Sequence, residues 1–138
     1  MTLSKHSYIG FLFIFLLSSC CFFQSQKICI TDAKIAAGVD EKLMPVNITD
    51  VFPKDTSKVS CWFQWKKAKI GTPIVAKWHY VTDDIHVFDY TFKIPRKEGK
   101  GSIALAMPEN KMLPPGEYKI DLTVDDHILK SLHFRIEE

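Results

Sequence analysis

The residues that could perform chemistry gather in one short stretch, HYVTDDIH, at positions 79–86. The imidazole and carboxylate groups of His79, Asp83, Asp84 and His86 are ligands that a transition metal accepts. However, nothing in the spacing requires the two histidines to face the same way, and Asp-Asp is ordinary turn chemistry. We therefore expect a solvated hairpin turn here, with no metal site and no other cofactor.

A catalytic constellation also finds little support in the sequence. The chain has no G-x-S-x-G elbow, no glycine-rich phosphate loop and no H-E-x-x-H motif. Cys61 is a possible nucleophile, but it lies on the apolar side of an alternating stretch, and a reactive cysteine needs an exposed, electropositive setting. We expect a protein that is not an enzyme, and we assign no catalytic residue.

The N-terminal stretch ends in a cysteine of a different kind. A short positive start precedes an apolar run from Tyr8 to Leu17, which has the length of a signal-peptide core and is too short to span a membrane. Leu17-Ser18-Ser19-Cys20 then resembles the bacterial lipobox, in which the cysteine is diacylated and becomes the mature N-terminus. The resemblance implies a lipoprotein signal peptide over 1–19, lipidation (palmitate) of Cys20 and a tether over 20–27. A plain signal peptide or an uncleaved anchor is the alternative.

Lipidation would decide where the protein works. One acyl chain gives only marginal membrane binding, whereas two or more hold a protein stably. The resemblance thus implies a bacterial cell-envelope protein, attached to a membrane through the lipid on Cys20, with its domain outside the cytoplasm. Removal of Lys5 with the signal leaves a mature charge near neutral, which argues against nucleic acid as a partner.

Two further cysteines, Cys29 and Cys61, remain after Cys20 and Cys21. In an exported protein such a pair suggests a disulfide, which would contribute about 3–4 kcal/mol in the chain-entropy model. The other reading is two buried thiols that act as small apolar residues. We predict that both lie at similar heights on two strands, although the sequence leaves both readings open.

Alternation of apolar and polar residues organises residues 28–138 into strands. Gly, Pro, Asp and Asn fill the breaks, as is typical of turns. This spacing predicts one all-β domain, a sandwich or a barrel, without an amphipathic helix. The expected strands lie near 28–37, 59–65, 74–80, 86–94, 103–107, 118–124 and 132–136, with a weaker one near 45–51.

The ending LPPGEYKIDLTVDDHILKSLHFRIEE favours the sandwich. Tyr118 follows a Pro-Gly turn and begins a strand. A hairpin then connects this strand to the last one of the domain. This resembles the terminal hairpin of bacterial immunoglobulin-like domains, with Tyr118 placed as a tyrosine-corner residue. The resemblance implies an immunoglobulin-like antiparallel β-sandwich of about 7–8 strands over 28–138. The cysteines depart from antibody domains, because they do not flank Trp78.

Aromatic and basic side chains are the candidate binding residues. Trp62 points opposite to Phe63, which suggests either a sheet face that meets a partner or simple partial burial by neighbouring side chains. If strand direction alternates, the loops 66–71 and 95–101 share one pole with the 125–127 turn, away from the tether. This basic end could meet an acidic partner or the negatively charged surface of a facing membrane; the alternative is that its lysines only keep exposed hairpins soluble. The possible partner-binding residues are Trp62, Lys66, Lys67, Lys69, Arg96, Lys97 and Lys100.

A non-catalytic, lipid-anchored envelope module fits these features best. It would bind a protein partner or support a larger assembly. A carbohydrate-binding module is the alternative, which an exposed aromatic platform around Trp62 would favour. A small enzyme would instead require a pocket with convergent polar groups.

Overall fold

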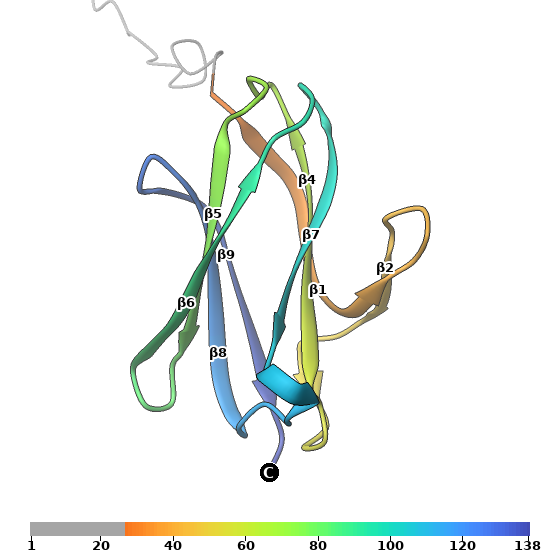
Figure 1. The fold of residues 1–138 in the computed structure, drawn as a ribbon, viewed down its shortest axis with the longest axis vertical. Coiled ribbons are helices and arrows are strands. Elements are labelled where there is room, and N and C mark those ends of the chain that lie inside the picture. The colour runs from red at the N-terminus through yellow and green to blue at the C-terminus, as the bar shows by residue number, and fades with distance from the viewer. Residues whose placement is uncertain (1–26) are drawn as a thin grey trace, which may run out of the picture.

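The computed structural model describes residues 27–138, which fold into two packed β-sheets (Figure 1). The strands are β1 Cys29–Val39, β2 Pro45–Ile48, β3 Val51–Phe52, β4 Lys58–Lys66, β5 Pro73–Tyr80, β6 Ile85–Lys93, β7 Gly99–Ala106, β8 Gly116–Val124 and β9 His127–Ile136. One sheet has the order β2-β1-β4-β7, and the other β3-β9-β8-β5-β6. Within the described residues, no helix is long and apolar enough to cross a membrane. The predicted all-β sandwich is confirmed.

The predictions for the N-terminal segment lie outside the described residues. They include the signal peptide over 1–19, Cys20 and every tether residue except Lys27. Lipidation of Cys20 therefore stays a prediction.

The core follows the predicted period of two along the strands. The interior rings of Phe63 and Trp65 meet Phe92 edge-on, with centroids 5.5 and 5.7 Å apart. On the other side of the core, Phe134 packs edge-on against Trp78 and stacks on Tyr118. Complete burial of one such side chain stabilises a fold by roughly 1.5–3 kcal/mol, so these rings account for much of the packing energy.

The strand β7 begins earlier than the predicted 103–107. Its first residues include Gly99 and Gly101, which do not look like strand formers. However, the strand passes directly over the core rings at this point. A Cβ on Gly101 would lie 3.1 Å from the Phe63 and Phe92 rings, and one on Gly99 would lie 2.9 Å from Trp65. Close approach of backbone to aromatic rings explains glycine here.

The weak strand expected near 45–51 is two short strands in different sheets. β2 pairs antiparallel with β1, whereas β3 pairs parallel with β9 in the other sheet. The chain changes direction after β2, in which Asn47 has a φ of +55°. Between the two strands, the Thr49 hydroxyl bonds to the backbone of Val51. The prediction of one strand is wrong, because short polar side chains that bond their own backbone favour a turn.

The terminal hairpin agrees with the sequence. β8 and β9 pair antiparallel, with Tyr118 opposite Phe134. The hydroxyl of Tyr118 donates to the carbonyl oxygen of Pro114, four residues upstream, at 2.6 Å. This is the tyrosine-corner geometry of immunoglobulin-like sandwiches, as predicted.

The strand directions give the sandwich two distinct poles (Figure 1). The β4–β5, β6–β7 and β8–β9 connections lie at one pole, and the β5–β6 and β7–β8 connections lie at the other with the end of β9. The shared pole expected for the 66–71, 95–101 and 125–127 segments is therefore confirmed. Backbone contacts join the first two, since the amide of Ala68 donates to the carbonyl of Lys97 at 3.0 Å.

The predicted pole for the start of the described chain is wrong. Cys29 at the start of β1 lies opposite Lys66 at the end of β4, so the described chain begins at the same pole as the basic loops. The error follows from the 45–51 segment. Counting one strand there places the chain start at the far pole, whereas the extra strand β3 reverses that parity.

The prediction that Cys29 and Cys61 lie at similar heights on their strands is also wrong, and the reading as a disulfide fails with it. Both cysteines are free, with Cys29 exposed and Cys61 buried. Although their strands are neighbours, Cys61 lies opposite Ile35, while Cys29 lies opposite Lys66. The six-residue offset along β1 corresponds to about 20 Å. A bridge needs Cα atoms within about 7 Å.

Candidate functional site

Six exposed cations gather at the pole where the described chain begins, and we name this surface the basic pole. Its members are Lys27, Lys66, Lys67, Lys69, Arg96 and Lys97. They come from three segments that are distant in sequence: the chain start, the β4–β5 connection and the β6–β7 connection. The acidic residues at this pole are Glu98, Asp125 and Asp126. The net charge of the surface is therefore positive.

Hydrogen bonds hold the two basic loops together. The amide of Gly71 donates to the carbonyl of Ile94 at 2.7 Å, beside the contact between Ala68 and Lys97. The indole nitrogen of Trp65 donates to the carbonyl of Arg96 at 2.9 Å. Because Trp65 is a buried core residue, this bond fixes the position of the β6–β7 connection relative to the core.

The cations of the basic pole are not paired with carboxylates of the described residues. Within residues 27–138, no carboxylate lies within 4.0 Å of any of the six cations. The carboxylate of Asp126, which also lies at this pole, is instead 3.4 Å from the ammonium group of Lys77 on β5. The positive charge of the pole is therefore free to act on a molecule outside the fold.

Lys100 does not belong to this surface, although it was expected to lie in the loop 95–101. It lies within β7, opposite Gln64. Its ammonium group approaches the sulfur of Met44 at 3.3 Å, on the side of the sandwich where the β1–β2 connection lies.

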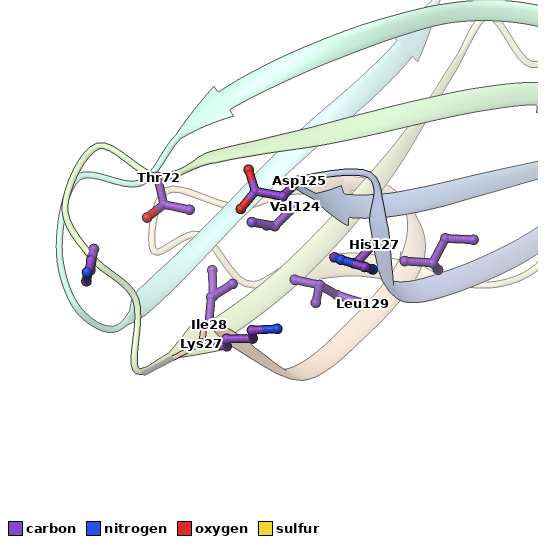
Figure 2. Close-up of a pocket in the computed structure, with 9 residues that line it drawn as sticks. Lys27, Ile28, Thr72, Val124, Asp125, His127 and Leu129 are labelled. Atoms are coloured by element: carbon purple, nitrogen blue, oxygen red, sulfur yellow. The ribbon is translucent and has the colours of Figure 1, made fainter. Parts of the chain in front are cut away.

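A solvent-open hollow of about 590 Å³ lies at the basic pole (Figure 2). It lies between the start of β1, the β4–β5 connection and the β8–β9 hairpin. Lys27, Lys69 and His127 contribute nitrogen groups, while Asp125 is its one carboxylate. The remaining lining is mainly apolar: Ile28, Thr72, Val124, Ile128 and Leu129. This composition is suited to non-covalent recognition of an anionic, partly apolar group.

Exposed isoleucines stand among the cations. Ile70, between Lys69 and Gly71, is 70% exposed, and Ile128 on the rim of the hollow is 60% exposed. The basic pole therefore combines positive charge with apolar tips.

The opposite end of the sandwich carries the opposite charge, and we name it the acidic pole. Its carboxylates are Asp50, Asp55, Asp83, Asp84, Glu109, Glu117, Glu137 and Glu138. Fewer basic residues lie there: Lys54, Lys58, Lys111 and Arg135. The fold is thus electrically polarised along its long axis.

The acidic pole also has an apolar hollow of about 250 Å³. Tyr80, Ile85, Leu105 and Leu113 are among the side chains that line it. Val81, Ile85, Val87 and Met112 are exposed around it, and Met112 is 61% exposed. The sequence did not predict this cluster, because its members come from β5, β6, β7 and two connections, and their proximity depends on the fold.

The expectation that Trp62 faces a partner is wrong. Its side chain is only 2% exposed, and its indole nitrogen donates to the carbonyl of Leu43 at 2.7 Å. Trp62 does point away from the core, but the connection between β1 and β2 folds over it. Consequently, the aromatic platform that would favour carbohydrate binding is not formed at Trp62.

The groups in HYVTDDIH form two separate pairs. His79 lies 2.9 Å from Asp84, and His86 lies 3.2 Å from Asp89. His79 and His86 are direct cross-strand neighbours. Nevertheless, no cluster of three or more potential metal ligands occurs within residues 27–138.

Cys61, the possible nucleophile, is fully buried. Burial raises the pKa of its thiol to about 12, so the group stays protonated and unreactive at neutral pH.

Comparison with known proteins identifies the fold and no more specific relationship. No protein-family model matches the chain, and no curated protein matches it. Among solved structures, an immunoglobulin-like protein from Pseudomonas aeruginosa aligns at a TM-score of 0.58 and 14% identity, over 80% of this chain and 97% of that one. A Pseudomonas fluorescens alkylpurine DNA glycosylase bound to DNA aligns at a TM-score of 0.47 and 13% identity, over 80% of this chain and 30% of its own length. The two-sheet arrangement and the first of these likenesses show that residues 27–138 form an immunoglobulin-like β-sandwich.

Proposed function

We propose that the chain is a non-catalytic, lipid-anchored binding module of the bacterial cell envelope, which holds a protein partner at its acidic pole. The anchor rests on Leu17-Ser18-Ser19-Cys20, which has the residue types of a lipobox. The observation that carries the orientation is the position of Lys27, which lines the hollow at the basic pole. The chain between Cys20 and Lys27 can extend by at most about 25 Å. A lipid on Cys20 would therefore keep the basic pole near the membrane and direct the acidic pole outward.

The acidic pole has the features of a small protein-binding surface. Exposed apolar side chains surround an apolar hollow, and the adjoining β5–β6 and β7–β8 connections supply a polar rim with Asp83, Asp84 and Glu109. Interfaces of this type bury a few large side chains within a polar rim. Basic residues of the partner would match the charge of the rim and speed association at low salt.

The anchor is tested by comparing two neighbouring cysteines. In a bacterial host, wild-type chain and Cys21→Ala should mature to an N-terminal Cys20 that carries acyl chains, whereas Cys20→Ala should remain an unlipidated precursor. Intact mass measurement distinguishes these products. A mature wild-type chain cleaved beyond Cys21 and free of lipid would refute the anchor.

The partner surface is tested by site-directed photo-crosslinking in intact cells. A photoreactive residue at Met112 should give a discrete crosslinked species, which Val87→Glu should weaken. The same residue at Ile48, which is also well exposed but lies on β2, should give none. Equal crosslinking from both positions would argue against a partner at the acidic pole.

A further inference from the structure

We propose that the basic pole docks directly onto the anionic phospholipid surface of the membrane that carries the anchor, with Ile70 and Ile128 entering the headgroup region. This inference rests on the proposed anchor for its orientation, but its contacts come from the folded domain alone. The domain would then stand upright on the bilayer rather than move freely at the end of its tether.

The first argument is the unpaired charge. Six cations project from the basic pole without an internal counterion in the described residues. Each Lys or Arg held near an anionic bilayer increases binding about fivefold, and the effect falls off within a Debye length. The three carboxylates at the same pole reduce this positive charge, but Asp126 already pairs with Lys77. The net charge of the basic pole is therefore positive, which favours its binding to a negatively charged surface.

The second argument is the presence of apolar tips among these cations. Ile70 is the most exposed of the large apolar side chains in the described residues, and its backbone lies between Lys69 and Gly71 at the tip of the β4–β5 connection. Surfaces that lie on membranes combine basic residues with apolar side chains that enter the headgroup boundary.

The third argument is the polarity of the whole fold. The carboxylates of the acidic pole lie at the far end of the long axis, so an anionic surface would attract one end and repel the other. The first described residue also emerges at the attracted end. Charge and chain direction therefore favour the same upright orientation.

Lysine acetylation of the full chain on vesicles tests this orientation. The purified chain is reconstituted into phosphatidylglycerol-containing vesicles or into purely phosphatidylcholine vesicles, and the acetylation rate of each lysine is followed by mass spectrometry. On the anionic vesicles at low salt, Lys66, Lys67 and Lys69 should react about fivefold more slowly than on the neutral ones. Lys54 and Lys111 at the acidic pole are internal controls whose rates should not change. High salt should remove the protection.

Two matched sets of variants separate charge from apolar insertion. Lys66→Glu, Lys69→Glu and Lys97→Glu together should abolish the protection of Lys67, whereas Lys42→Glu, Lys54→Glu and Lys58→Glu, with the same change in net charge, should not. Ile70→Ser should remove the protection that persists at intermediate salt, because burial of one isoleucine contributes about tenfold to the docking equilibrium. Ile48→Ser, another exposed isoleucine on β2, should leave it unchanged.

The result that overturns the inference is equal acetylation of the basic-pole lysines on both kinds of vesicle, or protection of Lys54 and Lys111 instead. Protection that is the same on neutral vesicles and insensitive to salt would also overturn it, since the anchor alone would then explain it. Intact mass of the same sample reports whether Cys20 carries lipid. A missing lipid would refute the anchor, while missing salt-sensitive protection would refute docking.

Discussion

The indole nitrogen of Trp62 donates a hydrogen bond to the carbonyl oxygen of Leu43, 19 positions earlier in the chain, at 2.7 Å. This bond fastens the connection between β1 and β2 onto the outer face of β4. Within the connection, the Asp40 carboxylate accepts from the amides of Lys42 and Met44 at 2.8 and 3.0 Å. The connection between β1 and β2 thereby covers the Trp62 side chain on the outer face of the sheet, a contact that the spacing of residues along the chain does not predict.

Replacing Trp62 by Phe should loosen this connection. The change keeps an aromatic ring but leaves the carbonyl of Leu43 without its donor, which should lower the free energy of unfolding by about 1–2 kcal/mol. Urea denaturation measures the loss, and hydrogen exchange should become faster at the amides of Lys42 and Met44. If exchange at these two amides stayed unchanged, the bond would not be what holds the connection.

The sequence predicted the strands with a strong alternation, and it failed where local chemistry competes with alternation. β4, β5, β8 and β9 each present one apolar row to the core, so period two was sufficient to identify them. The 45–52 segment was misread because the Thr49 hydroxyl bonds to the backbone of Val51, and that bond favours a turn. Because the prediction missed this reversal of chain direction, it placed the start of the chain at the wrong pole.

The candidate site was predictable in part for a related reason. The alternation of strand direction brings Lys66, Lys69 and Lys97 to one pole, so their proximity followed from topology alone. The burial of Trp62 and the offset of Cys29 from Cys61 depend on register and on loop packing. Neither property is contained in the spacing of residues along the chain.

Three glycine-to-alanine changes should separate backbone strain from steric contact. Gly116 has a φ of +136°, and a Cβ there would lie 2.5 Å from the Thr82 hydroxyl oxygen and 2.7 Å from Tyr80. Gly71 has a φ of +88° with open space around it, and Gly38 has neither constraint. We expect Gly116→Ala to cost more than about 2 kcal/mol, Gly71→Ala about 1 kcal/mol and Gly38→Ala almost nothing.

Thermal and urea denaturation of the three glycine variants give this order directly. The β5–β6 and β7–β8 connections meet at Gly116, since the amide of Glu117 donates to the Thr82 hydroxyl at 2.8 Å. Equal stabilities for Gly116→Ala and Gly38→Ala would mean that the two connections do not pack as described.

The two cysteines of the domain should differ in reactivity. Cys29 is exposed, whereas Cys61 is buried and its thiol has a pKa raised to about 12 by burial. A maleimide should therefore label Cys29 in the native protein within minutes, and Cys61 only after denaturation. Peptide mapping assigns the two labels. A Cys29–Cys61 disulfide peptide in protein from an oxidising compartment would contradict the register of β1 and β4.

Alkaline pH should destabilise the fold from about pH 9 upward. In the unfolded chain the Cys61 thiol ionises near its ordinary pKa of 9.0, but burial in the folded chain raises that pKa to about 12. Between these values the unfolded state binds fewer protons, so the free energy of unfolding falls by about 1.4 kcal/mol per pH unit for this group. Below pH 9 its contribution is fully present, and by pH 12 it is lost.

A second buried group should steepen this fall from about pH 10. Burial, and then the neighbouring Tyr80, raise the pKa of Tyr118 from 10.0 to about 12. Urea denaturation at half-unit intervals from pH 8 to 11 measures the slope. Cys61→Ala should flatten the part between pH 9 and 10 despite its lower stability at pH 8. Tyr118→Phe should flatten only the part above pH 10. A Cys61→Ala profile parallel to the wild type throughout would show that the thiol is hydrated in the folded state, contrary to its place in the core.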